Sequence, residues 1–355
     1  MKIKTNIFIV VVLIFLIPEK LLSQDPNFSQ FYNNLTYYNP AMTAINNGYT
    51  FKTSGRSLWT PISGKFNTFL SSFDASVAPI GNLIPGIGII LLSDVSGQAS
   101  LRTTGGYLNF SLGYTAGKNN LFMFKIGGSF GFINKSVDQS KFLFSDQLDE
   151  VSGIIYTSAF KSSLYSYNRL DNSIGGLIRF NTKQFKNNPI IKKTMITSGF
   201  SCHHLGVKDA FFEDQFNLPF KLNFYTNIKL LVGPTVLSPA LLIESQNKFN
   251  TSTIGTEITN NPLSIGIWYR NKSLAHKIKQ FDSFVMSVGY RLPMKGNINM
   301  KFTYSYDFTI SQLATSSFGS HEGNLIIDFD QRLLFGKIKT KKENKKMFQC
   351  PTEFN

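Results

Sequence analysis

The chain has 355 residues and a formal net charge of +15, and it combines 14% aromatic residues with only 16% charged residues. Soluble domains usually carry about 25% charged residues, so this composition disfavours an ordinary soluble protein. The mean hydropathy of -0.05 equally disfavours a membrane protein built from apolar helices.

Residues 1–23 are predicted to be a secretory signal peptide. Two lysines precede an unbroken apolar run at residues 7–17, and the small residue Ser23 marks a cleavage site that leaves Gln24 as the mature N-terminus. A membrane-anchoring helix is the alternative, but the run is shorter than the ~20 apolar residues that span a bilayer. We therefore expect an exported protein that has no nucleic-acid partner.

Residues 24–48 are polar and aromatic, without regular alternation. The aromatic side chains need burial, so we expect this segment to fold into the mouth of the β-barrel that the rest of the chain predicts, or to plug its lumen. An ordered arm before the first strand is the alternative. The candidate partner-binding residues of this segment are Gln24, Asp25, Pro26, Phe28, Ser29, Gln30 and Phe31.

From residue 49 onward, apolar and polar residues alternate in many short stretches. An example is residues 222–230, in which Leu222, Phe224, Ile228 and Leu230 alternate with Asn223, Tyr225, Asn227 and Lys229. Alternation with a period of two is typical of β-strands. The fold class is therefore predicted to be all-β, an antiparallel transmembrane β-barrel over residues 24–335 with its apolar face toward lipid. Alternation alone allows roughly twelve to sixteen strands of ~10 residues, and a soluble β-sandwich is the alternative.

Connections between the alternating stretches differ in length. Residues 116–120 and 292–296 are predicted to be short turns, and residues 134–169 and 272–282 to be longer outer loops. The last alternating stretch, residues 324–329, is expected to pair with the first strand and close the barrel, because lipid does not tolerate an open sheet edge.

No constellation of residues predicts catalysis or metal binding. Cys202, His203 and His204 are adjacent, but neighbouring residues of a strand point to opposite faces and do not share a ligand sphere. Ser320 and His321 are separated in the same way, which leaves no supported hydrolase site. We therefore expect no catalytic residue, no metal, no cofactor and no small-molecule substrate.

Polar residues also gather near the end of the alternating region. The candidates are Asp307, Ser320, His321 and Glu322. A hydrogen-bonded turn that sets strand register is the preferred interpretation, and partner binding is the alternative. Residues 336–355 form a lysine-rich tail that we expect to be solvated, with a contact to lipid headgroups or to an acidic partner as the alternative.

Both ends of the mature chain carry a family resemblance. The opening signature of the PorP/SprF family resembles Gln24-Asp25-Pro26, Phe28-Ser29-Gln30-Phe31 and Asn39-Pro40-Ala41, and its closing signature resembles Tyr304-Ser305-Tyr306-Asp307 with Ser320-His321-Glu322. Between them, the family's early hairpin and its Arg-x-x-Trp are similar to Gly86-Ile87-Gly88 with Ser93-Asp94 and Gly97, and to Arg56-Ser57-Leu58-Trp59.

This resemblance implies an outer-membrane barrel of about fourteen strands in the type IX secretion system of Bacteroidota. Such proteins serve in the secretion or surface retention of cargo proteins, including gliding adhesins. The implied partners are the secretion machinery, a cargo protein and outer-membrane lipid. A passive porin-like channel is the alternative. Cationic side chains on the polar face of the strands would make such a channel selective for anions. These side chains are Lys52, Arg56, Lys125, Lys221, Lys229 and Lys301.

Overall fold

The structure is a computed structural model. It describes residues 25–46, 48–58, 66–97, 100–117, 121–142, 144–149, 153–154, 158, 164–182, 191–209, 216–272, 281–294, 298–310 and 318–329. The predicted signal peptide, Gln24, Trp59 and the predicted basic tail lie outside the described residues.

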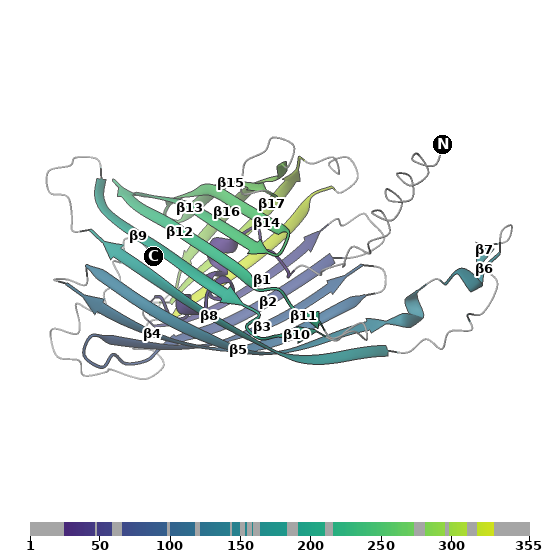
Figure 1. Ribbon diagram of the computed structural model, residues 1–355. Coiled ribbons are helices and arrows are strands. Elements are labelled where there is room, and N and C mark those ends of the chain that lie inside the picture. Colours follow the sequence, from purple (N-terminus) through teal and green to yellow (C-terminus); the bar gives the residue numbers. More distant parts are fainter. Residues whose placement is uncertain are drawn as a thin grey trace, which may run out of the picture.

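Fourteen strands form one closed antiparallel barrel (Figure 1). In ring order they are β1 (Tyr49–Leu58), β2 (Phe66–Ser76), β3 (Leu83–Ser96), β4 (Leu101–Ala116), β5 (Phe122–Asp138), β8 (Leu164–Asn181), β9 (Ile191–His203), β12 (Lys221–Val232), β13 (Thr235–Gln246), β14 (Phe249–Asn260), β15 (Leu263–Asn271), β16 (Phe281–Pro293), β17 (Ile298–Thr309) and β18 (Ser320–Phe329). The predicted all-β barrel of about fourteen strands is therefore confirmed.

The last strand closes the barrel against the first. β18 pairs with β1 in an unbroken antiparallel register, from Tyr49 opposite Phe329 to Leu58 opposite Ser320. This strand begins at Ser320, before the alternating residues 324–329 that predicted it. Every long strand is thus paired on both sides, which leaves no sheet edge to be satisfied by lipid.

Side chains sort by face as alternation predicts. Ile126, Phe130 and Leu170 point outward and are 67%, 64% and 68% exposed, whereas Lys125 and Arg169 on the same two strands are buried inside. Apolar side chains outside and polar side chains inside are what a strand needs when lipid surrounds the barrel. None of the helices in the described part of the chain has the length and apolar character needed to cross a bilayer.

The two ends of the barrel differ in their connections. At one end, which we call the turn rim, residues 233–234 and 261–262 each link two strands. At the other end, which we call the loop rim, the connections include residues 139–163 and 204–220. Short turns face the periplasm and longer loops face the outside in barrels of this kind. Within the long connections lie η3 (Gln139–Lys141), η4 (Ser145–Gln147), the hairpin β6 (Leu148–Asp149) with β7 (Gly153–Ile154), and the hairpin β10 (Lys208–Asp209) with β11 (Phe216–Asn217).

The predicted outer loops were too wide. β5 continues to Asp138 and β8 already begins at Leu164, so the ends of residues 134–169 are strand. The outward side chains there include Asn134, which lies opposite Asn168. Because both are polar, the sequence does not alternate between apolar and polar residues at these strand ends, and the alternation did not predict them. Residues 281–282, at the end of the second predicted loop, likewise belong to β16.

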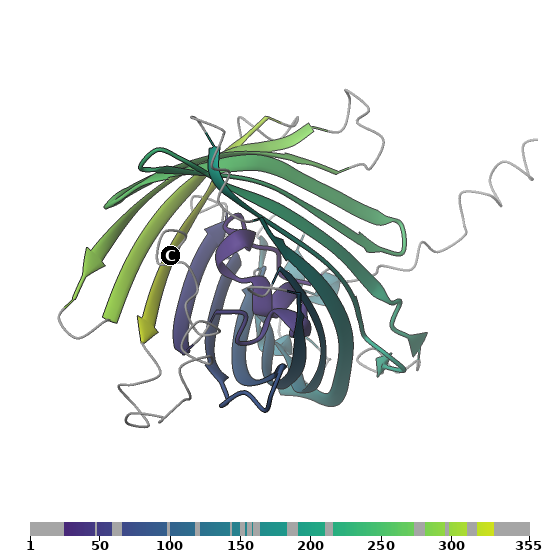
Figure 2. The same ribbon diagram turned by 90° about the vertical axis from the view of Figure 1, so that its left-hand side faces the viewer.

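The N-terminal segment lies inside the barrel. Its turns η1 (Phe31–Asn33), α2 (Leu35–Tyr38) and η2 (Pro40–Met42) coil within the ring of strands, as the purple ribbon in Figures 1 and 2 shows. We call residues 25–46 the plug. Its buried apolar residues are Phe28, Phe31, Tyr38, Ala41 and Met42, and they form the main core together with inward-facing apolar residues of the wall.

Candidate functional site in the barrel lumen

An aromatic cluster lies at the centre of the plug. Phe31 is completely buried and meets the Trp268 ring of β15 edge to face, with 5.1 Å between ring centroids. Tyr32 stacks on the same indole at 4.7 Å, and its hydroxyl donates a hydrogen bond of 3.0 Å to Ser287 Oγ. Aromatic pairs of this kind stabilise a fold by about 0.5–1.5 kcal/mol beyond the burial of their area. These contacts fix the plug against β15 and β16.

Two consecutive backbone amides of the plug bind one carboxylate of the closing strand. Glu322 Oε2 accepts a hydrogen bond of 2.6 Å from the Ser29 N–H, and Oε1 accepts one of 3.1 Å from the Gln30 N–H. The Gln30 side chain in turn donates to the Glu322 carbonyl oxygen at 3.0 Å and to Ser305 Oγ at 3.1 Å. The wall therefore satisfies plug amides that have no partner in a strand ladder, as buried backbone groups require.

The Ser29 hydroxyl lies at the centre of a buried ionic network. It donates to Asp307 Oδ2 at 2.5 Å and accepts from Arg270 Nη2 at 3.1 Å. Asp307 also accepts hydrogen bonds from Arg56 Nη2 at 3.0 Å and from Arg270 Nη1 at 3.3 Å. Arg56 donates a further hydrogen bond to the carbonyl oxygen of Asn27. With Glu322, the network contains two guanidinium groups and two carboxylates, so its buried charges compensate one another.

Asp25 anchors the plug at the loop rim. Its carboxylate lies 2.8 Å from His204 Nε2 and 3.8 Å from Lys221 Nζ, and His204 Nδ1 lies 3.0 Å from Asp171. Asp25 and His204 both lie outside the membrane-spanning strands. Burial works to lower the pKa of His204, but the two carboxylates outweigh burial and raise that pKa to about 9. Burial works to raise the pKa of Asp25, but the charge of His204 brings that pKa well below its ordinary value. The pair is thus an imidazolium and a carboxylate at neutral pH.

The Asn39-Pro40-Ala41 stretch of the plug rests on a glycine-bearing part of the wall. Asn39 Nδ2 donates to the Gly176 carbonyl at 3.1 Å, and its Oδ1 accepts from the Ala41 N–H at 2.9 Å. Gly127 of β5 faces the same stretch so closely that a methyl group there would come within 2.5 Å of the Ala41 nitrogen. Glycine at this position lets the two backbones approach.

The PorP/SprF family model, described as "Type IX secretion system membrane protein PorP/SprF", matches residues 21–327 of this sequence. The chain belongs to the PorP/SprF family. The resemblance carried by the terminal signatures is therefore confirmed, and the protein is a membrane protein of the type IX secretion system. No curated protein matches the chain.

The solved structures that are similar to this PorP/SprF protein include those of three bacterial transport proteins or their homologues. The toluene transporter TbuX of Ralstonia pickettii has 12% identity and a TM-score of 0.48, covering 83% of this chain and 92% of its own. A FadL homologue of Pseudomonas aeruginosa has 12% identity and a TM-score of 0.44, covering 84% and 94%. The toluene transporter TodX of Pseudomonas putida has 9% identity and a TM-score of 0.43, covering 86% and 94%. Identities this low do not extend the ligands of those transporters to this chain.

The plug brings most candidate residues of the two signatures together in the lumen. From the wall, Asp307 and Glu322 bind the plug directly, and Ser320 Oγ accepts a hydrogen bond of 3.3 Å from Arg56. Within the plug, the Pro26 carbonyl accepts a hydrogen bond of 3.1 Å from the Tyr37 hydroxyl. The polar contacts described above are made by Asp25, Ser29 and Gln30. The buried core contains Phe28 and Phe31. Both carboxylates lie within strands and bind the plug instead of a turn.

His321 is separated from the other candidates. Its Nδ1 lies 2.7 Å from the Tyr304 hydroxyl on the lipid-facing side of the wall. The adjacent residues Cys202, His203 and His204 are separated too, because His203 Nε2 lies 2.9 Å from the Tyr38 carbonyl while His204 binds Asp25. Among the residues that the structure describes, no three His, Cys, Asp or Glu side chains are placed to hold a metal ion.

Several wall residues that hold the plug could not be singled out from the sequence alone. Arg270 and Asp171 look like ordinary lumen-facing polar residues until the fold places Arg270 beside Ser29 of the plug and pairing of β8 with β9 places Asp171 beside His204. One signal was available for the aromatic contacts. Trp268 stands on the polar face of its strand, and a large apolar side chain at such a position indicates that something apolar packs inside the barrel.

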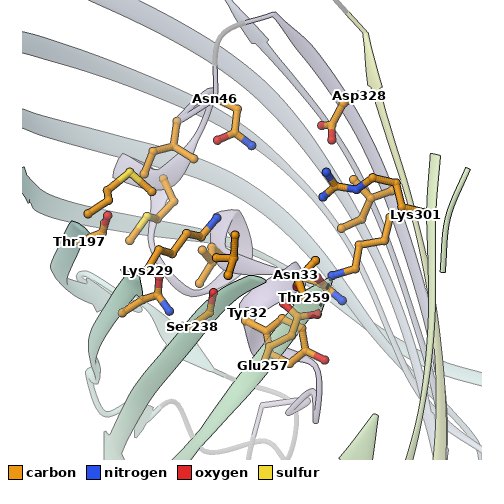
Figure 3. Close-up of a pocket in the computed structure, with 18 of the residues that line it drawn as sticks. Tyr32, Asn33, Asn46, Thr197, Lys229, Ser238, Glu257, Thr259, Lys301 and Asp328 are labelled. Carbon is orange, nitrogen blue, oxygen red and sulfur yellow. Dashed lines mark hydrogen bonds and ion pairs between the residues drawn. The ribbon is translucent and has the colours of Figure 1, made fainter. Parts of the chain in front are cut away.

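A cavity of about 190 Å³ lies on the turn-rim side of the plug (Figure 3). We call it the basal cup. The plug contributes Tyr32, Asn33 and Met42 to its lining, and the turn residues Pro234 and Asn261 show that it reaches the turn rim. Its charged lining consists of Lys52, Arg179, Lys229, Arg291 and Lys301, with Glu257 and Asp328.

Proposed function

We propose that this PorP/SprF protein is a non-enzymatic outer-membrane scaffold that supports the secretion of type IX cargo proteins, their anchoring at the cell surface, or both. The observation that best supports this proposal is the plug, which fills the lumen and is fixed by the buried contacts of Ser29, Gln30 and Asp25. A barrel that is filled in this way offers its rims, rather than an open pore, to other proteins.

The loop rim is the surface that we assign to cargo. Asp25, at the start of the described plug, is held by His204, which directly follows β9, and by Lys221, which begins β12. The opening signature therefore stands beside the connections that face the cell exterior. Loops carried by a rigid scaffold are the usual place for protein recognition. Cargo such as a gliding adhesin would meet the protein at this rim, and the secretion machinery would meet it at the turn rim.

The alternative of an anion-selective channel needs lumen cations that are available to ions. Lys221 instead pairs with Glu244 at 3.1 Å, and Lys301 pairs with Glu257 at 2.6 Å. Lys125 donates to a carbonyl of the plug at 2.5 Å. Lys52 pairs with Asp74 at 3.4 Å, and Arg56 pairs with Asp307 at 3.0 Å. Five of the six cations on which this alternative depends are therefore engaged with carboxylates or with the plug, which favours the scaffold.

Deletion of the gene tests the scaffold directly. Secreted and surface-exposed proteins of the deletion strain are measured by quantitative mass spectrometry and compared with those of a strain complemented by the wild-type gene. We expect at least one type IX cargo to be lost from the surface or the medium and to be restored on complementation. Unchanged secretion and display of every type IX cargo would contradict the proposal.

Two further measurements separate the scaffold from the channel. Tagged protein is isolated from gently solubilised outer membranes, and we expect type IX components or a surface protein to be recovered with it. The purified protein is also inserted into planar bilayers, where we expect no steady conductance. A steady anion-selective current together with recovery of the barrel alone would favour the channel.

A further inference from the structure

In the described part of the chain, β8 runs past the end of its neighbour β9 at the loop rim and has a strand edge without a partner there (Figure 1). We propose that an extended, uncharged segment of a cargo protein pairs with this edge and adds a strand to the wall. The inference rests on the proposed function, because it names the contact through which cargo would meet the loop rim. It deepens that function by assigning the contact to backbone groups rather than to charges.

Residues 164–173 of β8 have one neighbouring strand instead of two among the described residues. The pairing of β8 with β9 ends at Ile174 opposite Cys202. The pairing of β8 with β5 continues as far as Asp138 opposite Leu164, without a shift in register. At about 3.3 Å per residue, β8 and β5 therefore form a ribbon that extends roughly 30 Å beyond the end of the pairing with β9.

Two residues with positive φ take the chain away from β8 after β9. His204 has a φ of 63° and Gly206 a φ of 67°, and the His204 side chain is held by Asp25. The Leu205 N–H still donates to the Asn172 carbonyl at 3.0 Å. Farther along this connection, β10 pairs with β11. The strands of the connection are therefore paired with each other rather than with β8.

The even-numbered residues of β8 carry the backbone groups of the free edge. The Asn172 carbonyl points to the β9 side, whereas the Asn181 N–H donates to the Leu121 carbonyl on the β5 side. Successive residues of a strand direct their N–H and C=O groups to opposite edges. The unshifted register therefore aims the N–H and C=O groups of Ser166 and Asn168 at the side where β9 has ended.

This edge lies beyond the apolar belt of the barrel. Ile174 and Leu170 are exposed on the outer face of β8, and the next outward side chains toward the loop rim are Asn168 and Ser166. Polar outward side chains place this part of β8 in water rather than in lipid. Residues 164–168 contain neither a charged residue nor proline, and their register with β5 has no bulge. Proteins usually protect a free edge with these devices, so the edge is open to pairing.

The two faces of the ribbon indicate which side chains an added strand would carry. Tyr165 and Tyr167 are half-buried on the inner face, whereas Ser166 and Asn168 are exposed on the outer face. The side chains of an added strand would alternate in the same way. Apolar or aromatic side chains would lie beside the tyrosines, and polar ones beside Ser166 and Asn168. A lipid has no row of backbone donors and acceptors to match the edge, whereas an extended segment of an exported protein does.

Amide hydrogen exchange of the purified mature protein in detergent tests whether the edge is free. The readout is mass spectrometry with fragmentation that resolves single residues. We expect the amides of Ser166 and Asn168 to exchange at least about tenfold faster than those of Tyr165 and Tyr167, which point to β5. Equal protection of all four amides would show that another segment of this chain covers the edge, and would overturn the proposal.

A peptide probe tests whether the edge accepts a strand. The probe is fluorescein-labelled Thr-Val-Thr-Tyr-Thr-Val-Thr, and its binding is followed by fluorescence anisotropy. The control peptide has the same side chains but carries methyl groups on its backbone nitrogens, which removes the donors. We expect the probe to bind at least about tenfold more tightly than the control, because only the probe can complete the backbone hydrogen bonds. Equal binding, or no binding of the probe, would overturn the proposal.

A substitution of Ser166 locates the binding. Ser166→Pro removes an N–H from the free edge and leaves the ladder with β5 in place, because the Ser166 N–H points away from β5. Ser166→Thr keeps this N–H and is the matched control. We expect Ser166→Pro to lose about tenfold in affinity for the probe and Ser166→Thr to keep it. Equal affinities would overturn the proposal. Trp268 fluorescence checks folding, and Asn168→Pro replaces Ser166→Pro if that variant does not fold.

The same two variants in cells identify the occupant. At equal amounts of barrel in the outer membrane, we expect Ser166→Pro to lose most of the surface cargo that gene deletion loses, and Ser166→Thr to keep it. Normal display by Ser166→Pro, in cells where gene deletion abolishes display, would overturn the edge contact and leave the scaffold role in place. Normal display in the deletion strain would instead contradict the scaffold itself. A dimer of the purified protein that Ser166→Pro dissociates would assign the edge to a second copy of this chain and overturn the cargo contact.

Discussion

The carboxylate of Glu322 accepts a hydrogen bond of 2.6 Å from the backbone nitrogen of Ser29, across 293 positions of the sequence. Glu322 belongs to β18, the strand that closes the barrel by pairing with β1. The docking site of the plug is therefore incomplete until the ring is closed. Plugging and closure are coupled through this contact, which links the plug to the strand that closes the ring.

Replacing Glu322 by glutamine should loosen this coupling. Gln retains one acceptor oxygen, but the change removes a buried negative charge and leaves Arg56 and Arg270 beside the single carboxylate of Asp307. Breaking a buried ion pair in this way costs about 3 kcal/mol. We expect the free energy of unfolding in detergent, measured with a chemical denaturant, to fall by this order. The control is His321→Gln on the lipid-facing side, which should change stability by less than about 0.5 kcal/mol. Equal effects of the two changes would contradict the role of Glu322.

Phe31→Ala should detach the aromatic centre of the plug. The Phe31 ring is completely buried against Trp268, and removal of a buried phenylalanine ring costs about 3–5 kcal/mol. The chain has two tryptophans, so Trp59→Phe leaves Trp268 as the single reporter. We expect its emission to shift to longer wavelength in Phe31→Ala, because water reaches the indole. Phe308→Ala, on the lipid-facing side, should leave the emission unchanged.

Much of the barrel could be predicted because lipid imposes a strict rule on every strand. Stretches such as residues 222–230 and 324–329 alternate cleanly, and they became β12 and part of β18. The rule failed at the loop-rim ends of β5 and β8, where outward Asn134 and Asn168 leave no apolar face to detect. Strand ends beyond the apolar belt are therefore the part of this fold that alternation cannot find.

The plug could be anticipated, but its partners could not. Aromatic residues without alternation indicated a segment that needs burial, and the structure places Phe28 and Phe31 in the core. The partners are spread along the chain, and only the register of the closed ring brings Arg270 and Asp307 to Ser29. His204 looked at most like a metal ligand, because its partner Asp25 is 179 residues away in the sequence.

A methyl group on Gly127 should displace the plug from its seat. Gly127→Ala would place a carbon 2.5 Å from the Ala41 nitrogen, which is backbone and cannot rotate away. The neighbouring Gly128→Ala faces outward and would meet its nearest atom at 3.9 Å, an ordinary contact. We expect Gly127→Ala to give a steady conductance in planar bilayers and faster proteolysis of the plug, and Gly128→Ala to give neither. A closed, protease-resistant Gly127→Ala protein would show that the seat tolerates the extra volume.

The contact between Asp25 and His204 should make the plug sensitive to alkaline pH. The pKa of His204 is about 9, above its value of about 6.5 in an unfolded chain. A group whose pKa is raised on folding contributes its full stabilisation below the unfolded pKa, and that contribution is lost as the pH rises through the folded pKa. The stability of the protein should therefore fall between pH 7 and pH 9.5 by at most about 3 kcal/mol.

The assignment of this pH dependence to His204 rests on a comparison of variants. Lys221 also faces Asp25, at 3.8 Å, and pairs with Glu244 at 3.1 Å, so its charge is common to every variant compared. We expect His204→Gln to be less stable than the wild type at pH 7 and to lose most of the fall in stability between pH 7 and pH 9.5. His321→Gln removes a histidine that is remote from the plug and should keep the wild-type profile. If His204→Gln and the wild type follow parallel profiles, the charge that anchors Asp25 comes from Lys221 alone.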